Sequence, residues 1–183
     1  EQVAKVSYAP GKQPEGVDAG IDERATFSPS AANYPNGTHA CEVEIDPDTG
    51  EIEIQAYVIV DDVGTVLNPL LLKGQIHGGV AQGVGQAIME RAVYDGVGQN
   101  VSGSFMDYAM PRAQDFTLFD VKSNPVPTQQ NPLGVKGAGE AGTVGALPAV
   151  MNAIEHALRG AGVEKIDLPA SPERVWQALQ IAS

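Results

Sequence analysis

Residues 41–60 read CEVEIDPDTGEIEIQAYVIV, and this stretch decides the fold. Apolar and polar residues alternate on both sides of residues 46–50, DPDTG. A period of two is typical of strands with one buried face, and Asp, Pro and Gly favour a tight turn. The stretch therefore predicts a β-hairpin. Cys41 alternates with Val43 and Ile45, which indicates a buried strand position rather than a reactive thiol.

The segment after the hairpin predicts a long helix over residues 70–94. Its apolar residues fall on one helical stripe, and they are Leu72, Ile76, Val80, Val84 and Ile88. Five glycines lie in the same segment, and each costs about 1 kcal/mol relative to alanine in a helix. That cost predicts either very close backbone packing or a ligand resting against the helix. Core packing is a possible reason for Gly78 and Gly79, and it is less attractive for residues 82–86, where two glutamines flank the glycines.

Further elements follow in mixed order. Residues 119–121 are expected to form a short strand, and Pro148 is expected in the first turn of a helix that ends near Gly160. Ser171 and Pro172 are typical of an N-cap and first helical position, and they open the last predicted helix. The expected fold class is α+β, with a hairpin or mixed sheet and packed helices.

Residues 1–38 carry four prolines and no periodic pattern. A segment of this length without a pattern is unusual inside a compact domain. We therefore expect residues 1–38 to be an irregular segment that wraps over a surface outside this chain, and residues 39–183 to form the folded domain.

The composition excludes several classes of function. The chain has 11 basic and 23 acidic residues, a formal charge of −12, which makes nucleic acid and anionic membrane surfaces poor partners.

One cysteine excludes an internal disulfide and any multi-cysteine zinc or iron–sulfur site within the chain, and the three histidines are scattered, so no metal held by protein ligands is expected. No run approaches the roughly 20 apolar residues of a membrane span, and no signal peptide is visible, so we expect a cytoplasmic protein. The chain starts at Glu1, which suggests a cleaved product or a domain cut from a longer polypeptide.

Residues 134–142, GVKGAGEAG, place one Lys and one Glu among four glycines. A glycine-rich turn that leads into a helix gathers unpaired N–H donors and the positive end of the helix dipole, which suits an anion. Glu140 in that setting is either a helix-start carboxylate stabilised by the dipole or a proton-transfer group, and the spacing leaves both open. The loop lacks the phosphate-binding Walker pattern, because Lys136 is followed by Gly137 rather than by Ser or Thr.

The side chains near the glycines also have more than one interpretation each. Gln82 and Gln86 form either the solvated face of a helix or hydrogen-bonding partners of a planar heteroaromatic group. Lys136 is either a surface residue, a partner of a phosphate, or an ion-pair partner of Glu140. Together, the two glycine-rich segments predict a large, polar, planar ligand lying between them.

Three segments carry a family resemblance: residues 75–86 (QIHGGVAQGVGQ), 103–112 (GSFMDYAMPR) and 134–142 (GVKGAGEAG). Together with residues 46–50, 61–65, 68–69 and 169–176 (PASPERVW), they resemble the xanthine dehydrogenase/aldehyde oxidase family. More narrowly, they are similar to the C-terminal end of the bacterial molybdopterin-binding large subunit. By this resemblance, residues 39–183 are the C-terminal part of a molybdopterin-binding domain.

The resemblance implies a molybdenum hydroxylase that uses water as the oxygen source. Glu140 matches the active-site glutamate, which in that family takes a proton from a metal-bound hydroxyl group as its oxygen attacks an electron-poor carbon of an aldehyde or N-heterocycle. Gln82, Gly83, Lys136 and Gly137 match positions that lie along the pterin cofactor in relatives. A carboxylate in a water-poor pocket holds a proton more tightly, which suits a base.

The resemblance also implies partners. The cofactor would be molybdenum–molybdopterin cytosine dinucleotide, with the metal held by the pterin. [2Fe–2S] clusters and FAD would lie on other polypeptides, an iron–sulfur subunit and an FAD subunit, and the remainder of the large subunit would supply the other half of the pocket. We therefore expect no turnover from this chain alone. The alternative is a non-catalytic binding or assembly module that has the same fold and an empty cofactor cradle.

Overall fold

The computed structural model describes residues 1–9, 11–22 and 24–182. The chain divides into two compact units, Glu1–Ser30 and Ala31–Ser183. The described part of the first unit contains one short helix, α1 (Gln2–Ser7). The second unit contains the sheet and the other helices, and its first strand begins at Asn36. The wrapping role expected for residues 1–38 stays a prediction.

The predicted hairpin is confirmed, but its period of two is broken by an irregularity in the pairing between Glu42 and Val43, so that Tyr57 and Ile59 are buried while Val58 and Val60 are exposed. Strands β1 (Asn36–Ile45) and β2 (Ile52–Asp62) pair in antiparallel fashion. Gly50 closes the turn with a φ of 75°, a conformation that glycine adopts without strain. Strand β3 (Phe119–Ser123) confirms the second predicted strand and lies parallel to β2, which gives a mixed three-stranded sheet in the order β1-β2-β3.

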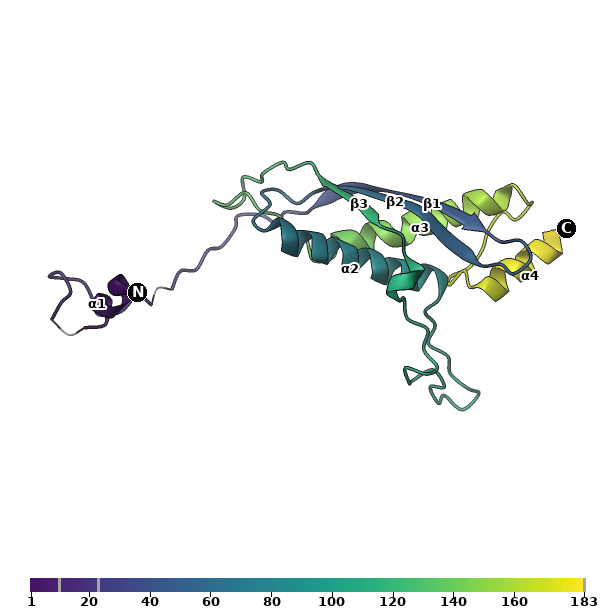
Figure 1. Cartoon of the computed structure of the whole chain (residues 1–183), viewed down its shortest axis with the longest axis horizontal. Helices are drawn as coiled ribbons and strands as arrows, with labels where there is room; N and C mark the ends of the chain where they lie inside the picture. Colours follow the sequence, from purple (N-terminus) through teal and green to yellow (C-terminus); the bar gives the residue numbers. More distant parts are fainter. Residues whose placement is uncertain (10, 23, 183) are drawn as a thin grey trace. The chain divides into compact units, whose positions relative to one another are not determined.

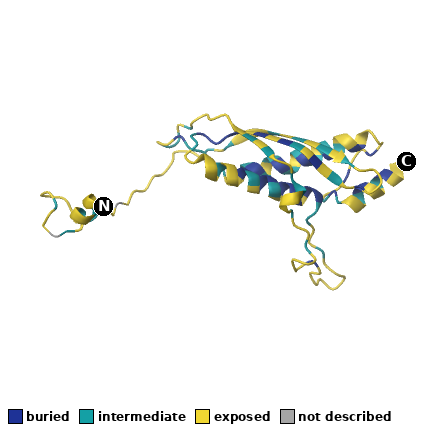
Figure 2. Cartoon of the chain, viewed as in Figure 1, coloured by how far each residue is buried: buried dark blue, intermediate teal, exposed yellow. Residues whose placement is uncertain are grey.

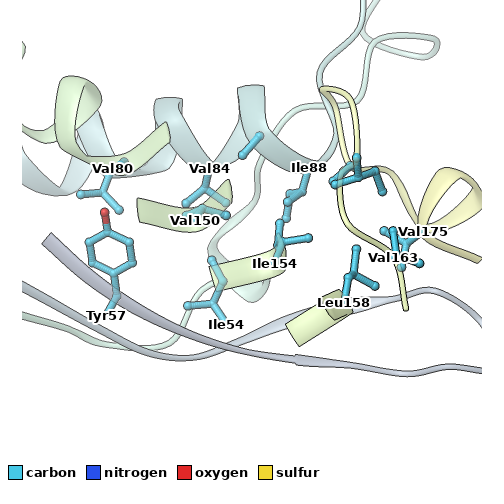
Figure 3. Packing of buried hydrophobic residues seen from close by; sticks show 14 of the residues in the cluster. Ile54, Tyr57, Val80, Val84, Ile88, Val150, Ile154, Leu158, Val163 and Val175 are labelled. Carbon is cyan, nitrogen blue, oxygen red and sulfur yellow. The ribbon is translucent and has the colours of Figure 1, made fainter. Parts of the chain in front are cut away.

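Two long helices cover one face of this sheet (Figure 1). They are α2 (Pro69–Ile88) and α3 (Ala141–Arg159), and the shorter α4 (Pro172–Ala182) follows them. A 3-10 turn, η1 (Ala113–Asp115), precedes β3. In Figure 3, Ile54 and Tyr57 point from β2 towards Val80 and Val84 of α2 and Val150 of α3. The opposite face of the sheet carries exposed side chains, as Figure 2 shows. The α+β class predicted from the sequence is confirmed.

Two helix boundaries differ from the prediction. Helix α2 ends at Ile88 rather than at residue 94, because the N–H groups of Met89 and Glu90 both donate to the Gly85 carbonyl and break the regular pattern. Helix α3 begins at Ala141, so Pro148 lies inside it and not in its first turn. Pro148 is exposed, so water can replace the hydrogen bond that a proline cannot donate.

Glycines bring α2 and α3 into direct backbone contact. A Cβ on Gly79 would lie 2.8 Å from the Thr143 nitrogen, and a Cβ on Gly83 would lie 2.6 Å from the Cβ of Ala146. A Cβ on Gly142 would lie 2.5 Å from the Ile76 carbonyl oxygen. These contacts fix the first turns of α3, and therefore the end of the 134–142 loop, against α2. Close packing, one of the two predicted reasons for the glycines, applies to Gly79 and Gly83.

Candidate active site

Glu140 stands at the N-cap of α3, and the local fold does not use its side chain. The carbonyl of Glu140 accepts the first intrahelical hydrogen bond, from the Val144 N–H, but its carboxylate caps no backbone N–H of the helix. The residue is exposed, so the described residues of this chain do not form the water-poor pocket expected around its carboxylate. Helix starts that need a cap favour Asn, Asp, Ser or Thr, so helix capping does not explain a glutamate here.

A cavity of about 580 Å³ lies beside Glu140. Its walls come from the segment that leads into β1, the start of β1, the end of β2, the loop before α3 and the first turns of α3. The lining residues are Tyr34, Pro35, Asn36, Gly37, His39, Asp61, Gly137, Gly139, Glu140, Ala141, Val144 and Gly145. The titratable side chains among them are those of Tyr34, His39 and Asp61 on the strand side and that of Glu140 on the α3 side.

Lys136 anchors the glycine-rich loop to the end of β2. Its Nζ lies 2.5 Å from Oδ2 of Asp62, and both side chains are almost buried, at 12% and 8% exposure. The hydrogen bond from Lys136 holds the pKa of Asp62 well below its usual range, and the Val126 N–H adds to the effect. Two backbone hydrogen bonds also attach the loop to the segment after β2. The Lys136 N–H donates to the Val63 carbonyl, and the Thr65 N–H donates to the Gly134 carbonyl. Lys136 is therefore neither a surface residue nor the ion-pair partner of Glu140.

A buried polar network forms the opposite wall. The Tyr57 hydroxyl oxygen lies 2.8 Å from Nδ1 of His39, and His39 Nε2 lies 3.4 Å from Oδ1 of Asp61. Burial raises the pKa of Asp61, and the neighbouring His39 opposes that rise. Burial, with the charges of Cys41 and Asp61, also raises the pKa of Tyr57, so its hydroxyl keeps its proton at neutral pH.

The structure brings some of the predicted site residues together and separates others. Glu140 and Gly137 line the same cavity, whereas Gln82, Gly83 and Lys136 are not among its lining residues. Gly83 is buried between the two helices, so helix packing accounts for its missing side chain. The cofactor roles of these five residues stay predictions.

The two glycine-rich segments meet without a gap for a ligand at Gly79 and Gly142. Unfilled space lies on the outer side of this contact. Added Cβ atoms at Gly78 and Gly137 would meet nothing within 4 Å, and one at Gly139 would lie 3.8 Å from Nε2 of Gln75. Gln82 lies beside this junction, where its Oε1 accepts a hydrogen bond from Thr143 Oγ1 at 3.0 Å.

Sequence reasoning missed His39 and Asp61. They are 22 residues apart, and only the hairpin register brings them together, because Gly37 pairs with Asp61 and His39 is the next residue on the same face of β1. Both residues lie just outside the predicted hairpin stretch of residues 41–60, so its alternation does not include them.

Neither a protein-held metal site nor a membrane helix is found in the part of the chain that the structure describes. No group of three or more His, Cys, Asp or Glu side chains there could hold a metal ion. No helix there combines the length and the apolar character needed to cross a bilayer. A cofactor that carries its own metal would instead need an open surface, and the unfilled space over Gly137 beside the uncapped carboxylate of Glu140 meets that need.

Comparison with known proteins identifies the family. Residues 1–117 match a family model described as a molybdopterin cofactor-binding domain. The large subunit of nicotine 6-hydroxylase from Paenarthrobacter nicotinovorans is 36% identical over 94% of this chain and 21% of its own length. The large chain of carbon monoxide dehydrogenase from Hydrogenophaga pseudoflava is 32% identical over 91% of this chain and 21% of its own length.

Solved structures agree with these matches. The Cu,Mo-CO dehydrogenase in its carbon monoxide reduced state superposes with a TM-score of 0.87 at 29% identity, covering 99% of this chain and 22% of that chain. Quinoline 2-oxidoreductase from Pseudomonas putida 86 superposes with a TM-score of 0.83 at 36% identity, covering 97% of this chain and 23% of that one. The chain spans about a fifth of the length of the curated relatives it matches. It belongs to the molybdopterin cofactor-binding domain family, as a region of a xanthine dehydrogenase-family large subunit.

Proposed function

We propose that this chain is the part of a molybdenum hydroxylase large subunit that supplies the active-site base and one wall of the cofactor site. The reaction is the oxidative hydroxylation of an electron-poor carbon, in an aldehyde or an N-heterocycle, with water as the oxygen source. Relatives named for nicotine and quinoline support the N-heterocycle class. The complex would also contain the remainder of the large subunit, an iron–sulfur subunit with [2Fe–2S] clusters and an FAD subunit.

The observation that carries this proposal is the carboxylate of Glu140. It ends a glycine-rich loop, lines a cavity of about 580 Å³ and makes no capping hydrogen bond. The Lys136–Asp62 ion pair and the Gly79–Gly142 contact hold the loop on both sides of it. A carboxylate fixed in place by a rigid backbone and left unpaired at a cavity is suited to accept a proton.

The residues on the open side of the loop would hold the cofactor. Gly137 offers its backbone to a bulky planar group, and Gln82 would contribute its side-chain amide from α2. When bound, the molybdenum–molybdopterin cytosine dinucleotide supplies the two-electron oxidation. Glu140 accepts a proton at its carboxylate and later returns it to solvent.

The test is the Glu140→Gln variant of the complete enzyme, which keeps the size of the side chain and removes its basicity. We expect the molybdenum content to stay normal and turnover to fall by about 10²–10⁴-fold, the usual contribution of a general base. Glu53→Gln, an exposed carboxylate on β2, is the matched control and should keep normal turnover. Near-normal turnover in Glu140→Gln would contradict the proposal.

Analysis of the native complex separates the enzyme from a non-catalytic module with the same fold. The proposal expects molybdenum and, after acid release, CMP in stoichiometric amounts. A complex that contains neither of them would favour the module.

A further inference from the structure

A second carboxyl group lines the Glu140 cavity, and the proposed reaction does not use it. The side chain of Asp61 is only 3% exposed, and its Oδ2 is buried without a hydrogen-bond partner among the described residues. A buried polar atom without a partner costs about 1–3 kcal/mol. Such a group needs an explanation, and an ionised oxygen at this place would cost more than a protonated one.

The side chains beside Asp61 are held in place by the packing of the fold. His39 is 5% exposed in its side chain, and its ring is held between β2 and α3. A Cβ on Gly145 would lie 2.6 Å from three atoms of that ring, so only glycine leaves room for it. The ring of Tyr57 meets the His39 ring edge-on, with centroids 5.7 Å apart. The ring of His39 therefore has a fixed orientation, with one nitrogen towards each oxygen.

We propose that Asp61 holds a proton at Oδ2 at neutral pH and therefore adds no negative charge to the cavity that it lines together with Glu140. In this arrangement the Tyr57 hydroxyl donates to Nδ1 of His39. The ring is then neutral, with its proton on Nε2 and directed at Oδ1 of Asp61. This inference rests on the proposed function of Glu140.

The charges around Asp61 support this proton assignment. The titratable neighbours of Asp61 are His39 on β1 and, beyond the ring of His39, Tyr57 on β2, whereas Tyr34 and Glu140 line the same cavity. Lys136 is engaged by the next residue, Asp62, and not by Asp61. With a neutral His39 ring, an ionised Asp61 would have no cation beside it, and burial already raises its pKa.

The consequence for Glu140 follows from like-charge repulsion. Two ionised carboxylates on one cavity repel each other, so the state with both charges carries an electrostatic cost. A protonated Asp61 avoids this repulsion. As the pH rises and Asp61 loses its proton, the second negative charge enters the cavity wall.

Infrared difference spectroscopy of the complete large subunit tests the assignment without any need for turnover. The spectrum of wild type minus Asp61→Asn at neutral pH should contain the carbonyl band of a protonated carboxyl group, and the same band should fade in wild type as the pH is raised. Tyr57→Phe should also lose the band, because Nδ1 can then take a proton and Asp61 can ionise beside the cation. Asp120→Asn, an exposed carboxylate on β3, is the matched control and should leave the band in place. A wild-type spectrum without this band would overturn the inference in favour of an ion pair between His39 and Asp61.

The pH dependence of kcat/KM gives the functional counterpart. In Asp61→Asn, which cannot ionise, the alkaline part of the kcat/KM profile should differ from that of wild type, because no negative charge from residue 61 enters the cavity. Identical alkaline limbs in the two proteins would overturn the proposed effect of Asp61 on the cavity. The two proposals fail separately, because normal turnover in Glu140→Gln removes the proposed base, whereas an ionised Asp61 in the infrared spectrum removes only this inference.

Discussion

Lys136 Nζ lies 2.5 Å from Asp62 Oδ2, and this ion pair joins the glycine-rich loop to the last residue of β2. Asp62 also accepts hydrogen bonds from the N–H groups of Gly64 and Val126. One carboxylate therefore holds together the end of the hairpin, the segment after β3 and the loop that leads to Glu140. The position of the proposed base depends on this junction.

Removal of the cation should destabilise the subunit strongly. Lys136→Met leaves a buried Asp62 carboxylate without its partner, and we expect a loss of about 3–5 kcal/mol of unfolding free energy in chemical denaturation. Lys122→Met is the control, since Lys122 and Asp120 form an exposed pair, and it should change stability by no more than about 0.5 kcal/mol. Equal losses in the two variants would contradict the structural role of Lys136.

The same ion pair predicts a pH dependence of stability. The pKa of Asp62 in the folded state lies well below the usual value of 3.8, so the folded state binds this proton more weakly than the unfolded state. Its stabilising contribution is complete above pH 3.8 and is lost as the pH falls further. The stability difference between wild type and Asp62→Asn should therefore shrink on acidification through this range. A difference that stays constant would contradict the depressed pKa.

Adjacent glycines in α2 should respond differently to alanine. Gly79→Ala places a Cβ 2.8 Å from the Thr143 nitrogen and should destabilise the subunit by about 1–3 kcal/mol, measured by denaturation. Gly78→Ala meets no atom of this chain within 4 Å, so it lacks that penalty and gains helix propensity of up to about 1 kcal/mol. A larger loss in Gly78→Ala than in Gly79→Ala would contradict the packing of α2 on α3.

The Gly137→Val substitution should lower the cofactor content and leave the stability of the chain unchanged. A Cβ here meets nothing within 4 Å, so Gly137→Val can be accommodated by the loop itself but fills the space expected for the cofactor. We expect less molybdenum per subunit and an unchanged unfolding transition of the cofactor-free protein. Gly96→Val, at an equally open position in a turn, is the control. Full molybdenum loading of Gly137→Val would contradict the expected cofactor position.

Cys41 should be an inert thiol. Burial raises the pKa of Cys41 to about 11, so little thiolate exists at pH 8. Peptide mass spectrometry after treatment with iodoacetamide should find Cys41 unmodified in the native protein and alkylated after denaturation. Rapid alkylation in the native protein would show that β1 is open to solvent at this position.

The sequence predicted the fold best where local chemistry dominates. The alternation around Gly50 gave both strands of the hairpin, and Ser171–Pro172 gave the start of α4. The end of α2 was missed, because neither glycine nor proline marks Met89 and the helix stops through a shift in backbone hydrogen bonds at Gly85.

The candidate site was predictable only in part. Glu140 stood out as an acid among glycines, but the reason for Gly83 lies in Ala146, which is 63 residues away and contacts it only after α2 and α3 pack. The ion-pair partner of Lys136 could not be predicted either, since Asp62 is 74 residues distant in the sequence. Pairings of this kind depend on tertiary structure, and no local pattern encodes them.

The most direct test of the account is the rate at which substrate reduces the molybdenum centre in a single anaerobic turnover, with wild type and Glu140→Gln at equal molybdenum content. This rate isolates the step in which the proposed base acts from later electron transfer and product release. We predict a fall of about 10²–10⁴-fold in Glu140→Gln. A reduction rate close to that of wild type would show that the carboxylate at the start of α3 is not the base.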